Sequence, residues 1–229
     1  MSKKILFSLI SLLIVIGGVV AFSAFEAHVI NVTAHIENAL KVIPPSELVF
    51  GTVFPQEYRT KHLFITTSES FCKPDQLRVL NIDYKFVQKP KCICVDSAYC
   101  KIGEYAPVGY ATDECPQGYE EMPSLCEYLS KTPIDGDLEP YDDHGVPAFH
   151  NPEDPSSIAT GTINKKKDLQ DEWIIDLATP CYKGYCGQDY DEFVHRYNPL
   201  ADSHDYEAIG DPAGTTFGCD LWVEVTNIY

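Results

Sequence analysis

Apolar and polar residues alternate at every second position along much of this chain, and this alternation limits its fold more than any other feature. A period of two predicts a β-strand with one face in a core and the other in solvent. The clearest example runs from Val79 to Gln88, before Lys89-Pro90, where proline ends the strand. Its apolar members are Leu80, Ile82, Tyr84 and Phe86.

Similar patterns predict several more strands and almost no helix after residue 23. The expected strands cover residues 28–36, 48–50, 63–66, 158–163, 172–178 and 219–228. Only residues 123–129 resemble a short helix, with Pro123 near its first turn. Spaced strands joined by long loops predict an all-β fold, an antiparallel β-sandwich that is jelly-roll-like. Residues from about 91 to 157 read as a long, cysteine-rich insertion within this single domain of residues 24–229.

The first 23 residues predict export. Lys3 and Lys4 precede an apolar run from Ile5 to Phe22, and small residues follow at its end. A basic start, an apolar core and small residues are typical of a secretory signal peptide, with cleavage expected before Ala24. The run is also long enough for a retained hydrophobic helix that anchors the chain in a membrane. Both alternatives place residues 24–229 outside the cytoplasm, after contact with the membrane and a signal peptidase.

The cysteine content fits an exported protein. The nine cysteines are Cys72, Cys92, Cys94, Cys100, Cys115, Cys126, Cys181, Cys186 and Cys219. Disulfides are favoured over zinc, because Cys92 and Cys94 lack the two-residue gap of a zinc knuckle. Cys181 and Cys186 are expected to close a small loop around Gly184, while the remaining pairing stays open. An odd number leaves at least one thiol free, capped or paired between chains.

The charge of the chain restricts its partners. It has 34 Asp and Glu residues against 17 Lys and Arg, a formal net charge of −17 at pH 7. Such a surface repels nucleic acids, so no nucleic-acid partner is expected. It attracts cations, but solubility alone also accounts for this composition.

No recognisable catalytic or phosphate-binding motif is present, and no enzyme activity is predicted. His144 and His150, or His195 and His204, lie near aspartates, and we interpret both pairs as parts of solvated loops. No cofactor is expected, although calcium is a minority hypothesis, because it prefers several carboxylate oxygens. The candidate calcium ligands are Asp135, Asp137, Glu139, Asp142 and Asp143.

The leader also carries a resemblance to a known family. Lys3-Lys4, the apolar run containing Gly17-Gly18, and Ala21-Phe22-Ser23 resemble the leader of TasA/camelysin-type exported proteins, which a SipW-like signal peptidase processes. The order of the predicted strands over about 60 following residues is similar too. This resemblance implies a jelly-roll protein that is secreted or attached to the cell surface. In some members, an N-terminal strand completes the sheet of the neighbouring subunit in a fibre.

A second resemblance implies export and little more. The chain resembles a set of uncharacterised exported bacterial proteins in three segments. These are Phe50–Glu57, Leu125–Lys131 and Phe217–Thr226.

Three functions remain open from the sequence. The first is a structural surface or matrix protein that associates with itself by strand donation. Its donor face would be Ile30, Val32, Ala34 and Ile36. The second is an extracellular module that binds carbohydrate or a surface partner through its acidic and aromatic loops. Its candidate aromatic side chains are Tyr141, Phe149, Tyr190 and Tyr197. The third is an exported hydrolase.

Overall fold

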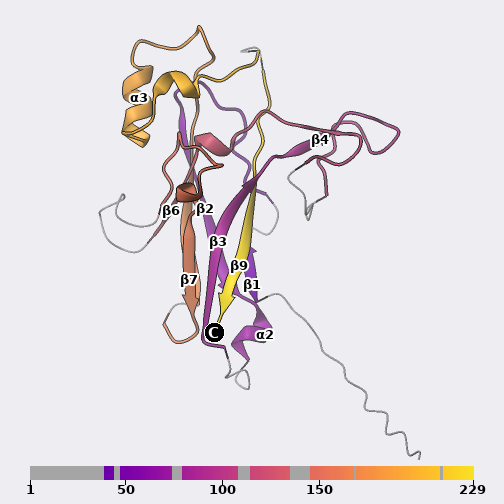
Figure 1. Ribbon diagram of the computed structural model, residues 1–229, viewed down its shortest axis with the longest axis vertical. Coiled ribbons are helices and arrows are strands. Elements are labelled where there is room, and N and C mark those ends of the chain that lie inside the picture. The colour runs from indigo at the N-terminus through magenta and orange to yellow at the C-terminus, as the bar shows by residue number, and fades with distance from the viewer. Residues whose placement is uncertain are drawn as a thin grey trace, which may run out of the picture. The chain divides into compact units, whose positions relative to one another are not determined.

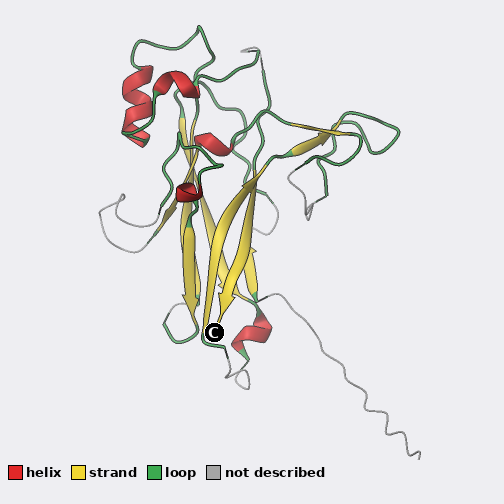
Figure 2. Ribbon diagram, in the orientation of Figure 1, coloured by secondary structure: helices red, strands yellow, loops and turns green. Residues whose placement is uncertain are grey.

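The computed structural model describes residues 39–43, 47–73, 79–107, 114–134, 145–167, 169–211 and 214–229. These residues form a β-rich unit with a few short helices (Figure 2). All pairings between its named strands are antiparallel, so the β-rich, antiparallel class predicted from the sequence is confirmed. The predicted N-terminal hydrophobic helix and the strand at 28–36 lie outside the described residues.

The strands form three sheets (Figure 1). The four-stranded sheet has the order β1 (Leu40–Ile43), β2 (Tyr58–Thr67), β8 (Gln170–Ala178) and β6 (Leu129–Pro133). The three-stranded sheet has the order β7 (Thr160–Asn164), β3 (Asn81–Lys89) and β9 (Asp220–Ile228). A small sheet pairs β4 (Cys92–Cys94) with β5 (Tyr119–Glu121).

The helices are short and lie between strands. Among the described residues, two are α-helices, α2 (Glu69–Cys72) and α3 (Tyr190–Tyr197). Three are 3₁₀ turns, η1 (Cys126–Tyr128), η2 (Pro155–Ser157) and η3 (Ser203–Tyr206).

The two larger sheets share one hydrophobic core, which the alternation in β3 and β8 builds. Ile82, Tyr84 and Phe86 of β3 are each at most 2% exposed, as are Trp173, Ile175 and Leu177 of β8. The rings of Phe86 and Trp173 meet edge to face with their centroids 4.8 Å apart. Large aromatic side chains bury much apolar area, so this contact is the centre of the packing.

Three local predictions were wrong. Residues 48–50 form no strand, because Gly51 turns the chain with a φ of +75°, yet Leu48 and Phe50 still pack against the core. Although almost no helix was predicted after residue 23, α3 buries Tyr190, Phe193 and Val194 on one face. Finally, the predicted helix at 123–129 is only one 3₁₀ turn, and the chain then enters β6, which belongs to the main sheet.

Replacing Gly161 with alanine is expected to destabilise the fold by about 2 kcal/mol, because an added methyl group would overlap the Tyr84 ring. That ring is fixed on both sides: its hydroxyl donates to Asp171 Oδ2 at 2.6 Å and accepts from Trp173 Nε1 at 2.8 Å. Urea unfolding measures the loss. The neighbouring exposed substitution Thr160→Ala is the control, and an equal loss in both variants would contradict this explanation.

Candidate functional site

The outer edge of β9 is the most unusual surface in the described part of the chain. Among the described strands, β9 pairs only with β3, so its other edge has free backbone groups. Opposed residues of an antiparallel pair project from the same face. The register therefore places Leu221, Val223, Val225 and Ile228 on the core face, opposite Gln88, Phe86, Tyr84 and Ile82. We call these four residues of β9 the open apolar edge.

The open apolar edge is poorly covered, although its neighbours on β3 are buried. Val225 is 41% exposed and Ile228 is 47% exposed. Their register partners Tyr84 and Ile82 are 1% and 0% exposed. The core side chains of β3 are therefore covered, whereas those near the end of the neighbouring strand β9 remain partly exposed to solvent. A row of half-exposed apolar side chains beside an unpaired strand edge is a typical site for pairing with another chain.

Among the described strands, the four-stranded sheet also ends in an edge strand, β1. β7, at the far edge of the three-stranded sheet, contacts β8. The other edge strand of the three-stranded sheet is β9, and β1 is an edge strand of the four-stranded sheet. Leu40 and Val42 of β1 are half-buried and pack against the core. Apolar side chains of both edge strands, β1 and β9, are thus packed at the border of the core.

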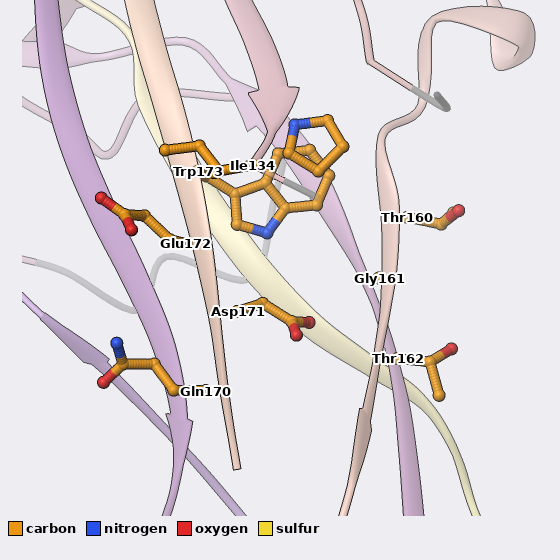
Figure 3. Close-up of a pocket in the computed structure, with 9 residues that line it drawn as sticks. Ile134, Thr160, Gly161, Thr162, Gln170, Asp171, Glu172 and Trp173 are labelled. Carbon is orange, nitrogen blue, oxygen red and sulfur yellow. The ribbon is translucent and has the colours of Figure 1, made fainter. Parts of the chain in front are cut away.

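The opposite side of the core contains a polar groove of about 520 Å³ between β7 and β8. Figure 3 shows Asp171 projecting from β8 toward the strand that carries Gly161. Burial and the neighbouring Asp171 raise the pKa of Tyr84, whose hydroxyl therefore remains a stable donor to this carboxylate. Trp173 also lines the groove but is 1% exposed, so its ring face is closed to a ligand. Two carboxylates line the groove, those of Asp171 and Glu172, and Glu172 is paired with His62 at 2.7 Å.

The predicted disulfides are confirmed for eight of the nine cysteines. The pairs are Cys92–Cys115, Cys94–Cys100, Cys126–Cys219 and Cys181–Cys186. The small loop closed by Cys181 and Cys186 is the pair that the sequence suggested. Cys72, at the end of α2, keeps a free and exposed thiol.

Most aromatic side chains proposed to stack on sugars are occupied by packing. Phe149 is completely buried and Tyr190 nearly so, because both belong to the core. Tyr197 stacks on Tyr58 with ring centroids 4.9 Å apart. Tyr141 lies outside the described residues. Three of the four aromatic residues proposed to bind carbohydrate are thus packed against other side chains and are not available to stack on a sugar.

His195 and His204, which the sequence analysis placed in solvated loops, each lie beside a carboxylate. His195 pairs with Asp191 at 3.4 Å, and His204 pairs with Glu207 at 3.0 Å, which raises the pKa of His204. In the described ranges, no group of three or more His, Cys, Asp or Glu side chains is arranged to hold a metal. His144, the five candidate calcium ligands and the four donor-face residues all lie outside these ranges. The donor-face residues are Ile30, Val32, Ala34 and Ile36.

Sequence reasoning missed a buried polar group between the sheets. Lys131 of β6 is 1% exposed and His150 is 5% exposed. Gln88 of β3 approaches His150, with 3.2 Å between their Nε2 atoms. The sequence around Lys131 does not indicate that it is buried. Which face of the sheet its side chain lies on is decided by the pairing of β6 with β8.

No family model matches this chain, and no curated protein or solved structure shows significant similarity to it. Over the part of the chain that the structure describes, no helix is both long and apolar enough to span a membrane. The fold and its four disulfides define the class: an antiparallel β-protein whose bonds are suited to an oxidising, extracellular environment.

Proposed function

We propose that this protein is a non-enzymatic structural protein of the cell surface or extracellular matrix, which associates with itself by strand donation. Residues 28–36 of one copy would pair with the β9 edge of the next copy. The observation that carries this proposal is the open apolar edge, whose Val225 and Ile228 face the core side and remain half-exposed.

The arrangement of the sheets supports a specific architecture for this assembly. Sheets of four and three strands share one core, as in a β-sandwich. A donated strand beside β9 would give two sheets of four, the strand number of a jelly roll. It would also pair the free backbone groups of β9, which an unprotected edge strand leaves available for association.

The chemistry of the donor segment matches the acceptor. Ile30, Val32, Ala34 and Ile36 project from one face of an extended strand, because side chains alternate. The open apolar edge also presents four residues on one face. Alternate side chains of the donor would cover this face while its backbone continues the sheet.

Chain direction favours a donor from a second copy. α2 follows β2 directly, and the C-terminus after β9 lies close to α2 (Figure 1), so β2 and β9 end at the same end of the sheets. β1 is antiparallel to β2 and therefore begins there. A segment of the same chain running toward the start of β1 would be parallel to β9. A segment from another copy is free to pair antiparallel, as the named strands of this protein do.

The test is the oligomeric state of the protein beginning at Ala24, measured by sedimentation velocity over a wide concentration range. We expect concentration-dependent oligomers, lost on deleting residues 28–36 or on Val225→Lys, because a charge in the acceptor face must be desolvated on pairing. Asn227→Lys is the matched control: Asn227 is opposite Asp83 on the outer face of the same strand. A protein that stays monomeric throughout, or equal effects of both lysines, would refute strand donation at β9.

A further inference from the structure

Five lysines gather at one end of the two large sheets, although acidic residues outnumber basic ones by 34 to 17 in the whole chain. We call them the basic end: Lys41, Lys73, Lys165, Lys166 and Lys167. Four of them are exposed to solvent, and Lys165 is partly buried. Glu69 is the acidic residue of the adjacent helix α2, and Asp168 follows the lysines in the sequence. Positive charge therefore prevails at this end.

Hydrogen bonds bring the lysines together from three segments of the chain. Lys165 Nζ donates to Lys73 O at 3.2 Å, so the turn after β7 lies against the end of α2. Ser68 N donates to Ala39 O at 2.9 Å, so the start of α2 lies beside the start of β1, the strand that carries Lys41. Figure 1 shows α2 and the end of β7 at the same end of the sheets as the C-terminus.

The turn that carries three of these lysines is held in one conformation. Asn164 Oδ1 accepts from Lys166 N at 2.8 Å and from Lys167 N at 3.1 Å. Lys165 N donates to Leu80 O at 2.8 Å, which ties the turn to the residue that precedes β3. A turn fixed in this way loses little backbone entropy when a partner binds to it.

Exposed apolar side chains accompany the lysines. Leu169 comes two residues after Lys167 and is 47% exposed. Tyr229 is 54% exposed, and its carbonyl accepts from Leu80 N at 2.8 Å, while Leu80 O accepts from Lys165 N. Tyr229 therefore flanks the same turn from the other side of β3. Lysines mixed with leucine and tyrosine are typical of surfaces that lie at the boundary between lipid headgroups and acyl chains.

We propose that the basic end binds a membrane surface that carries anionic lipid headgroups. The lysines would contact the lipid phosphates, while Leu169 and Tyr229 enter the interface beside them. These apolar side chains favour a membrane over a soluble polyanion, which offers them no apolar phase. The order of the chain supports the same choice, because only 17 residues separate Phe22, the end of the apolar run, from Leu40 at the start of β1.

The negative net charge of the chain does not prevent this contact. At physiological ionic strength the Debye length is about 8 Å, so acidic side chains elsewhere on the domain are largely screened from the membrane. Each lysine near an anionic surface contributes about fivefold to the affinity. This inference does not depend on strand donation, since the basic end includes neither the donor segment nor the open apolar edge.

The test is co-sedimentation of the protein beginning at Ala24 with lipid vesicles, so that the leader cannot contribute. We expect binding to vesicles of phosphatidylcholine mixed with phosphatidylglycerol, weakened by high salt, and little binding to phosphatidylcholine alone. The double variant Lys166→Glu, Lys167→Glu should lower the affinity by at least about 20-fold. The matched control is Lys101→Glu, Lys183→Glu, which changes two exposed lysines elsewhere and alters the net charge equally.

Absence of binding to the mixed vesicles, or equal losses in the two double variants, would overturn the proposal. Binding of soluble polyphosphate by a wild-type protein that ignores both kinds of vesicle would also overturn it, and would assign the lysines to a polyanion. Leu169→Ser should weaken vesicle binding and leave its salt dependence unchanged, because it removes apolar contact only. The variant without residues 28–36 should still bind vesicles, so a failure of strand donation and a failure of this proposal are separate results.

Discussion

Removing the Cys126–Cys219 disulfide with the double variant C126A/C219A is expected to lower the free energy of unfolding by about 4–5 kcal/mol. This bond closes the longest ring of the four, with a sequence separation of 93. A longer ring restricts the unfolded chain more, so its loss returns more conformational entropy to that state. Urea unfolding followed by circular dichroism gives the change.

The position of the bond supports a large effect. Cys126 belongs to η1, directly before β6 of the four-stranded sheet, and Cys219 directly precedes β9 of the three-stranded sheet. Neighbouring backbone groups also pair there, since Leu125 N donates to Gly218 O and Gly218 N donates to Pro123 O. The bond thus holds together two segments that enter different sheets.

The matched control is C181A/C186A, which removes a disulfide with a sequence separation of only 5. So small a ring restricts the unfolded chain less, and its loss is expected to cost about 2 kcal/mol. We therefore expect the first variant to lose at least twice as much stability as the second. Equal losses would show that ring size does not govern the contribution of these bonds.

The strands of the core could be predicted from the sequence because their alternation is a local signal. In β3 and β8 the burial of every second residue follows the apolar pattern directly. The helix α3 carried a signal too, since Tyr190, Phe193, Val194 and Tyr197 have helical spacing, but its polar surroundings obscured it. β6 has no alternating pattern, and its place in the sheet depends on pairing with β8.

The candidate site could not be predicted, because the exposure of a strand at a sheet edge depends on which strands lie beside it in the fold. Val223 and Val225 read as ordinary inward-facing residues of the last strand, and only the strand order leaves them at an edge. The pairing of most cysteines could not be predicted either, because it depends on which cysteines come close together in the fold. Gln88 and His150 likewise meet only in the folded chain, since 62 residues separate them in the sequence.

Acid is expected to destabilise this protein through His150, by up to roughly 4 kcal/mol between pH 6.5 and 3. Burial, and then the charge of Lys131, lower the pKa of His150 from 6.5 to about 3 in the folded state. The unfolded chain therefore binds a proton in this window that the folded chain excludes. Stability is complete above pH 6.5 and is lost as the pH falls toward 3. Urea unfolding across this range measures the slope, which His150→Phe should flatten.

Other titratable groups also change the free energy of unfolding in this pH range. The informative quantity is therefore the difference in slope between the wild type and the variant. Burial raises the pKa of Glu127 and Asp176, which opposes acid destabilisation, and both groups are common to the wild type and the variant. His204→Asn is the control, because the Glu207 carboxylate raises the pKa of His204 and its protonated form stabilises the fold at low pH. Removing it should leave the acid loss in place or enlarge it slightly. An unchanged slope in His150→Phe would mean that acid acts through the carboxylates, and that the buried imidazole does not resist protonation.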